Sequence, residues 1–180
     1  MFIRTATEED ANQLIDIYRP YIENNTTSFE YKVPSLDEFK QRISDIAIKY
    51  PYIVMVDGTK ILGYAYAHEY KERDAYQWTV EVSIYLPKNA QGKGIGSKLY
   101  NSLEEYLRRQ HVVNIMACIT GSNKISIAFH EHLGYETVGI FKKVGFKNNQ
   151  WLDICWLEKQ ISSPIHPETF VPFSKLTEWD

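Results

Sequence analysis

Residues 78–99 read WTVEVSIYLPKNAQGKGIGSKL, and this stretch decides how the rest of the chain can be arranged. Its first part alternates, which predicts a strand whose apolar face is Trp78, Val80, Val82, Ile84 and Leu86. The other face carries Thr79, Glu81, Ser83 and Tyr85. A glycine-rich loop follows, and then a predicted helix with Leu99, Leu103 and Leu107 on one side. Glu81 therefore lies mid-strand on the polar face, just before the loop.

The loop from Gln91 to Gly96 joins a strand to the start of a helix. In that position, successive backbone N–H groups and the helix dipole can bind a phosphate or a pyrophosphate. Glycine lets the backbone approach such a ligand closely, and Lys93 or Lys98 can add positive charge at the rim. A flexible glycine turn is the alternative interpretation, because glycine clusters alone are weak indicators.

Two nucleotide-binding motifs are excluded by spacing. A Walker loop needs Gly-Lys-Ser/Thr, whereas this chain has Gly96-Ser97-Lys98. A dinucleotide-binding fingerprint would need its third glycine one position later.

The remaining pattern predicts a mixed α/β domain with one sheet and helices on both of its faces. Asp57-Gly58 predicts a hairpin turn between strands at 52–56 and 61–67. The other expected elements are an edge strand at 2–5, helices at 8–22, 35–50 and 123–133, and strands at 114–119, 136–143 and 151–158. Residues 1–161 are expected to form the domain, and residues 162–180 an extended tail on its surface or on a partner subunit.

Composition narrows the function classes. The net charge of -3 and the pI near 6.0 argue against nucleic-acid binding. No apolar run is long enough for a membrane span, and the N-terminal residues lack a leader-like core, so a cytoplasmic location is expected. Cys118 and Cys155 lie in apolar runs typical of buried, reduced thiols. His130 and His132 diverge on a helix, so no metal site is expected.

Gln91, Gly94 and Gly96 match the Q/R-x-x-G-x-G/A signature, and the chain resembles the GNAT superfamily of N-acetyltransferases. The segments WTVEVSIYL, SNKISIAFHEHLGYE and GFKNNQWLDICWLEKQI resemble its phosphinothricin and methionine sulfoximine acetyltransferase branch, and the resemblance covers roughly residues 2–161. It implies the GNAT fold, with a mostly antiparallel sheet, acetyl-CoA as cofactor and a homodimer. The implied cofactor contacts are the main chain of Ile84, Tyr85 and Leu86 and the loop residues Gln91, Gly92, Lys93, Gly94, Ile95, Gly96 and Ser97.

Acetyl transfer to an amine requires removal of a proton from the ammonium form, and Glu81 is the leading candidate for that general base. A solvated or salt-bridged strand glutamate is the alternative. His130 falls where many GNAT enzymes have a tyrosine that assists the leaving sulfur, and a structural or cofactor-contacting histidine is equally compatible. Asn123 matches a cofactor-contacting position, and a helix N-cap is the competing role.

A free amino acid needs an arginine for its carboxylate and an aromatic wall. Arg73, Tyr76 and Thr79 shortly precede Glu81, and Phe29 matches a substrate-side aromatic of the resembling branch. Arg73 could equally be a solvated loop charge. The sequence thus predicts acetylation of the α-amine of a small amino acid or analogue. The alternatives are acetylation of a protein N-terminus or polyamine, and a non-catalytic acyl-CoA sensor.

Overall fold

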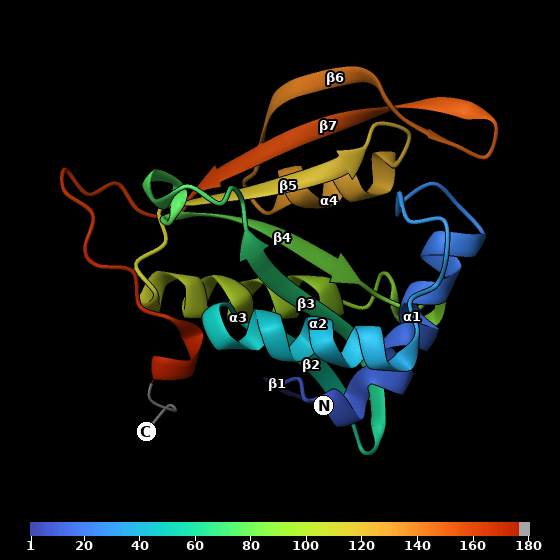
Figure 1. The fold of residues 1–180 in the computed structure, drawn as a ribbon, viewed down its shortest axis with the longest axis horizontal. Helices are drawn as coiled ribbons and strands as arrows, with labels where there is room; N and C mark the ends of the chain where they lie inside the picture. The colour runs from blue at the N-terminus through green and yellow to red at the C-terminus, as the bar shows by residue number, and fades with distance from the viewer. Residues whose placement is uncertain (177–180) are drawn as a thin grey trace.

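The fold is described from a computed structural model, which places residues 1–176. A seven-stranded sheet has the order β1-β2-β3-β4-β5-β7-β6, as Figure 1 shows in ribbon form. Its strands are β1 (Phe2–Thr5), β2 (Tyr52–Asp57), β3 (Lys60–Glu69), β4 (Thr79–Tyr85), β5 (Asn114–Thr120), β6 (Glu136–Lys147) and β7 (Gln150–Gln160). The helices are α1 (Ala11–Glu23), α2 (Leu36–Lys49), α3 (Ile95–Arg109) and α4 (Lys124–His132). The predicted mixed, mostly antiparallel architecture is confirmed.

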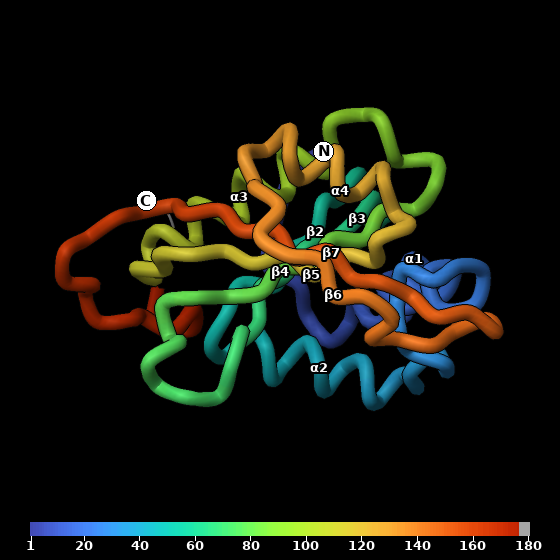
Figure 2. The backbone as a smooth tube through the Cα atoms, turned by 90° about the horizontal axis from the view of Figure 1, so that it is seen from above, coloured from blue at the N-terminus to red at the C-terminus, as the bar shows by residue number. Residues whose placement is uncertain are grey.

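The helices cover both faces of the sheet. Figure 2 shows α3 and α4 on one side and α1 and α2 on the other. Each side has its own core, because alternate strand residues point to opposite faces: Val80 and Val82 pack with α3, whereas Val54 and Tyr64 pack with α1 and α2. The predicted cap of α2 is present, since the side chain of Ser35 accepts a hydrogen bond from the backbone of Glu38. No helix among residues 1–176 is long and apolar enough to span a membrane.

The separation of two neighbouring strands in the sheet determines where the site lies. Within the described residues, β4 and β5 form the one parallel pair, and their register runs only from Thr79–Asn114 to Glu81–Met116. Beyond that point both strands continue without pairing with each other, and Figure 1 shows them diverging. The backbone edges beyond Glu81 therefore face a gap in which other groups can bind.

Two predictions about the C-terminal half were wrong. The strand predicted to end at Lys143 continues to Lys147, with irregular pairing between Phe141 and Gly145. Lys143 has a positive φ of 52°, so the bulge interrupts the alternation that the sequence pattern relies on. Cys118 is exposed, although Cys155 is buried as expected.

The C-terminal segment packs on the domain. Phe170 is buried against Tyr50, and the side chain of Gln110 donates a 2.9 Å hydrogen bond to the carbonyl of Val171. The last part of the predicted tail, residues 177–180, lies outside the described residues.

Candidate active site

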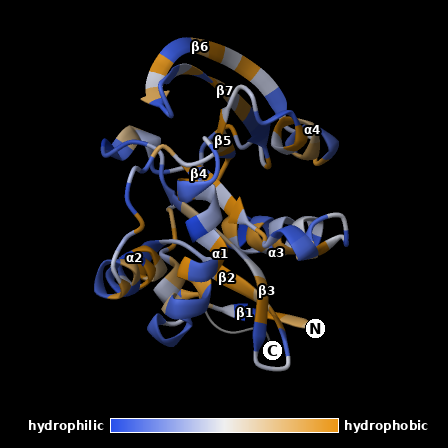
Figure 3. Cartoon of the chain, turned by 90° about the vertical axis from the view of Figure 1, so that its right-hand side faces the viewer, coloured by the Kyte–Doolittle hydropathy of each residue, from blue (hydrophilic) through white to orange (hydrophobic). Residues whose placement is uncertain are grey.

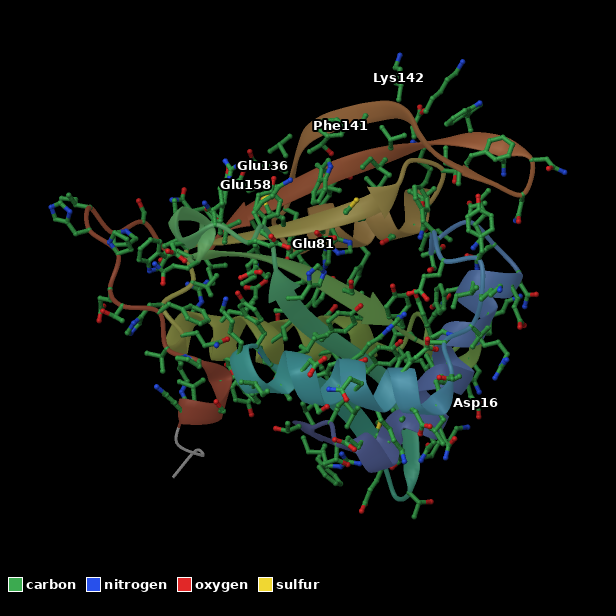
Figure 4. The ribbon with its side chains drawn as sticks, in the orientation of Figure 1. Asp16, Glu81, Glu136, Phe141, Lys142 and Glu158 are labelled. Carbon is green, nitrogen blue, oxygen red and sulfur yellow. The ribbon has the colours of Figure 1, made fainter. Side chains whose placement is uncertain are left out.

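Glu81 stands in a line of side chains that crosses five strands. Register pairs His68 with Glu81, Glu81 with Met116, Met116 with Glu158, and Glu158 with Glu136, so all five share one face. Figure 4 shows Glu136 and Glu158 beside each other on the β6–β7 ribbon. The Glu81 side chain is only 22% exposed. It is the carboxylate placed where β4 and β5 begin to separate.

Burial raises the pKa of the Glu81 carboxyl above its ordinary value, and the charges of His68 and Lys71 pull that pKa back down. A carboxylate with a raised pKa is a better proton acceptor near neutral pH than an exposed one.

A cleft opens between β4 and β5 beyond Glu81. Its walls combine β4 residues 82–85, β5 residues 117–120 and side chains from α3 and α4, including Tyr100, Asn123 and His130. Asn123 caps α4 by accepting a 3.1 Å hydrogen bond from the Ser126 backbone, so the N-cap role is present and the residue also lines the cleft. The structure thus brings Ile84, Tyr85, Asn123 and His130 together around this cleft, and their contacts with acetyl-CoA stay a prediction.

The glycine loop is open where a ligand would approach. Gly92 and Gly94 have φ values of 70° and 74°, and a β-carbon built on either would meet nothing within 4 Å. The first N–H groups of α3 have no acceptor within the helix. Gly96 differs, since its β-carbon would lie 3.0 Å from the Phe129 ring. Gly96 therefore serves close packing, and the open cradle is formed around Gly92 and Gly94.

Two predicted cofactor contacts are engaged within the protein. The Tyr21 hydroxyl donates a 2.5 Å hydrogen bond to the Leu86 carbonyl, and the Gln91 amide donates to that hydroxyl at 3.3 Å. Gln91 thus braces the start of the loop against α1. Ile95 is buried, whereas Lys93 is exposed at the rim and Ser97 is partly buried.

His130 is a neutral, fully satisfied imidazole. Its Nδ1 donates to the Ser126 carbonyl at 2.7 Å, so Nε2 must accept the 2.9 Å hydrogen bond from the Tyr100 hydroxyl. Burial lowers its pKa, although the Ser126 hydrogen bond opposes that shift. This arrangement favours a structural role, and assistance to the leaving sulfur stays a prediction.

The predicted substrate residues lie on β4, in the loop before it and against the β6–β7 hairpin. Thr79 is two residues from Glu81 on the same face of β4, and Arg73 is exposed in the preceding loop. Tyr76, which is 41% exposed, contacts Tyr70 edge-to-face with ring centroids 5.8 Å apart. Tyr70 in turn meets Trp156 of β7 at 5.9 Å. The aromatic wall therefore includes two residues that the sequence analysis missed.

Phe29 packs on the β6–β7 hairpin. A β-carbon on Gly145 would lie 2.2 Å from Cε2 of the Phe29 ring, so only glycine allows this contact.

His68 and Cys118 were also missed as neighbours of Glu81. The predicted strand at 61–67 stops before His68, whereas β3 continues to Glu69 and places His68 opposite Glu81.

Comparison with known proteins identifies the architecture. Residues 3–156 match the model of the Acetyltransferase (GNAT) domain. This chain belongs to the GNAT acetyltransferases. It is 31% identical over 174 residues to phosphinothricin N-acetyltransferase of Streptomyces viridochromogenes, covering 97% of this chain and 95% of the relative. It is also 31% identical over 159 residues to L-methionine sulfoximine/L-methionine sulfone acetyltransferase of Pseudomonas paraeruginosa, with 87% and 92% coverage.

A solved structure extends this similarity to three dimensions. The crystal structure of a phosphinothricin acetyltransferase from Sinorhizobium meliloti in complex with acetyl-CoA superposes with a TM-score of 0.89. The two chains are 35% identical, and the match covers 96% of each. The cofactor of this GNAT acetyltransferase is acetyl-CoA. The unpaired strand edges and the open loop at Gly92 and Gly94 fit that molecule.

Proposed function

We propose that this protein acetylates the α-amine of a small amino acid of the phosphinothricin, methionine sulfoximine or methionine sulfone kind, with Glu81 as general base. Acetyl-CoA supplies the thioester that the amine attacks. Glu81 removes the proton from the amine nitrogen, and the backbone around Gly92 and Gly94 holds the pyrophosphate of the donor. The half-buried position of Glu81 at the mouth of the β4–β5 cleft is the observation that carries this proposal.

The surroundings of Glu81 support an amino-acid substrate. An aromatic wall formed by Tyr70, Tyr76 and Trp156 can contact the substrate side chain. Arg73 is exposed in the adjoining loop and offers a guanidinium for the substrate carboxylate. The compounds in the names of the two relatives, phosphinothricin, L-methionine sulfoximine and L-methionine sulfone, belong to this chemical class.

Glu81→Gln tests the base. The amide keeps the shape of the side chain but accepts no proton, so kcat falls by about a hundredfold or more while acetyl-CoA binding is retained. Glu158→Gln is the matched control, because Glu158 shares the face of Glu81 and is separated from it by Met116. Equal activity of Glu81→Gln and the wild type would contradict the proposal.

Three outcomes separate the alternatives. CoA release is measured with phosphinothricin, methionine sulfone, a polyamine and a peptide with a free N-terminus. Turnover with an amino acid alone supports the proposal, and turnover only with the peptide or polyamine favours the second enzyme function. A chain that binds acetyl-CoA but turns over no amine is a sensor, and Glu81→Gln then changes nothing.

A homodimer is part of this proposal. Six large hydrophobic side chains of the β6–β7 hairpin are 46–60% exposed, and patches of this kind are typical of interfaces. Figure 3 shows hydrophobic and hydrophilic residues interspersed along the outer arc of β6. The residues are Val138, Ile140, Phe141, Val144, Phe146 and Trp151. Light scattering checks the mass, and Phe141→Glu is expected to give a monomer. A monomeric wild-type protein would refute the proposed dimer.

The cytoplasmic location stays a prediction.

A further inference from the structure

His68 of β3 faces Glu81 of β4, and the mechanism above gives it no task. The two residues are directly opposed in the antiparallel register, so their side chains lie on one face of the sheet. Nε2 of His68 is 3.9 Å from Oε1 of Glu81. This distance suits an ion pair when the ring is charged, and a small rotation or one water joins the two groups by hydrogen bonds.

A second contact determines which nitrogen of His68 holds the proton. Nδ1 lies 3.0 Å from the backbone carbonyl oxygen of Glu69, and a carbonyl oxygen can only accept. Nδ1 therefore carries its hydrogen in both the neutral and the charged ring. In the neutral ring the lone pair is on Nε2, the nitrogen nearest to Glu81. This tautomer can take a proton from Glu81.

The two side chains differ in their access to water. His68 is 36% exposed, whereas Glu81 is 22% exposed. Glu81 must lose the captured proton after each turnover, and burial makes its direct release to solvent harder than release from an exposed group. The imidazole provides a route from the carboxylate toward solvent.

Other titratable groups surround the pair. Lys71, in the loop after β3, adds positive charge near Glu81, and Cys118 faces Glu81 from β5. The Tyr66 ring centroid is 6.0 Å from that of His68, and Glu69 is held by Lys49 of α2 at 2.8 Å. Among these neighbours, His68 is the imidazole, which carries a hydrogen on one nitrogen and a lone pair on the other and can therefore both donate and accept a proton.

We propose that His68 is a positioning residue that accepts the catalytic proton from Glu81 and passes it to solvent. The inference rests on the proposed role of Glu81 as base. First the amine N–H bond breaks and an O–H bond forms on Glu81. That O–H bond then breaks as an N–H bond forms on Nε2 of His68, leaving a carboxylate beside an imidazolium. The imidazolium finally releases the proton to water or buffer.

His68→Gln tests this route through the pH profile of kcat. The variant is expected to be about tenfold slower, a smaller loss than removal of the base itself. Added imidazole restores the rate, because a small base in solution replaces the missing ring. The acid limb of the profile moves to higher pH, since loss of the imidazolium leaves Glu81 easier to protonate.

Controls separate this proposal from a folding defect and from failure of the base. His68→Asn is a second variant, and His111→Asn is its control because His111 has a similar pairing with Glu168 at 3.5 Å. The double variant of His68→Gln and Glu81→Gln should be as slow as Glu81→Gln alone. The relay is refuted if His68→Gln has the kcat of the wild type. It is also refuted if the variant is slow but is neither rescued by imidazole nor shifted in the acid limb of its pH profile. Either result leaves the role of Glu81 as base unaffected. An active Glu81→Gln overturns both.

Discussion

Nζ of Lys147 donates a 2.6 Å hydrogen bond to the backbone carbonyl of Ser28, 119 residues earlier in the chain. The same ammonium donates at 2.7 Å to the carbonyl of Ile22 in α1, and Lys147 is only 4% exposed. Ser28 immediately precedes Phe29, whose ring packs against Gly145 of the same strand as Lys147. The end of β6 therefore holds the segment that carries a predicted substrate contact.

Lys147→Met is expected to lower the free energy of unfolding by about 2 kcal/mol, because two buried carbonyls lose their donor. The KM for the amine rises as Phe29 loses its support, whereas the KM for acetyl-CoA does not change. Urea denaturation and initial rates measure both effects. Lys142→Met is the control, since Lys142 lies on the same strand and points outward in Figure 4. Equal effects of the two substitutions would refute this explanation.

Gly94→Ala tests the cradle. Alanine at a positive φ costs about 1–2 kcal/mol of stability. It also fills the open space at the loop, so the Kd for acetyl-CoA rises about tenfold or more. Gly58→Ala is the control, because Gly58 has a φ of 60° and open space but lies in the β2–β3 turn. Calorimetry should show weaker binding only for Gly94→Ala, and unchanged affinity there would mean that the cradle lies elsewhere.

His130→Gln tests the neutral imidazole. Loss of its contact with the Tyr100 hydroxyl costs about 1–2 kcal/mol at pH 7.5, because a buried donor is left without its acceptor. Because burial lowers the pKa of His130 in the folded protein, the unfolded chain binds more protons below the ordinary imidazole pKa of about 6.5, and the free energy of unfolding decreases as the pH falls. The advantage of the wild type over the variant therefore shrinks as the pH falls below about 6.5 and stops changing once the pH is below the lowered folded pKa.

Unfolding is followed with denaturant at several pH values. The raised pKa of Glu81 changes the pH dependence of the free energy of unfolding in the opposite direction. Its contribution is the same in the wild type and in His130→Gln, so it cancels in the difference between them. A difference that stays constant with pH would show that His130 does not titrate in this way. If kcat of His130→Gln falls much further than its loss of stability can account for, that result would instead support a role of His130 in assisting the leaving sulfur.

Cys118 offers a chemical probe of the cleft. Cys118 is exposed at the edge of the cleft, and partial desolvation of its sulfur, together with the charges of Glu81 and Cys155, raises the pKa of its thiol to about 12. Iodoacetamide should therefore react with it roughly a thousandfold more slowly than with free cysteine at pH 8. Acetyl-CoA should slow the reaction further, because Cys118 lines the same cleft. Mass spectrometry of wild type and Cys118→Ser locates the label, and fast labelling would contradict this environment.

Local patterns predicted most of the elements. Ser35 before α2, Asp57-Gly58 between β2 and β3, and the alternation around Glu81 each depend on near neighbours in the chain. The glycine loop was placed for the same reason, because strand, turn and helix follow one another directly. These features were therefore available from the sequence.

Contacts across the sheet were not available. His68 and Glu81 are opposed only because of the β3–β4 register, and Trp156 reaches the site because β7 inserts between β5 and β6. Cys118 was wrongly predicted to be buried because an apolar run does not reveal where a neighbouring strand departs. The β4–β5 gap leaves that thiol exposed.

That gap also has a consequence for the dynamics of the sheet. Among residues 1–176, β4 and β5 are joined by the pairs from Thr79–Asn114 to Glu81–Met116, and beyond them the two strands are connected through the shared α3 core and the contacts of β6 with α1, not through backbone pairing. A bound acetyl donor that forms hydrogen bonds with both strand edges would link β4 to β5 across the gap. Amide exchange across β5 and β7 would then report occupancy of the cleft, even in a variant that cannot turn over.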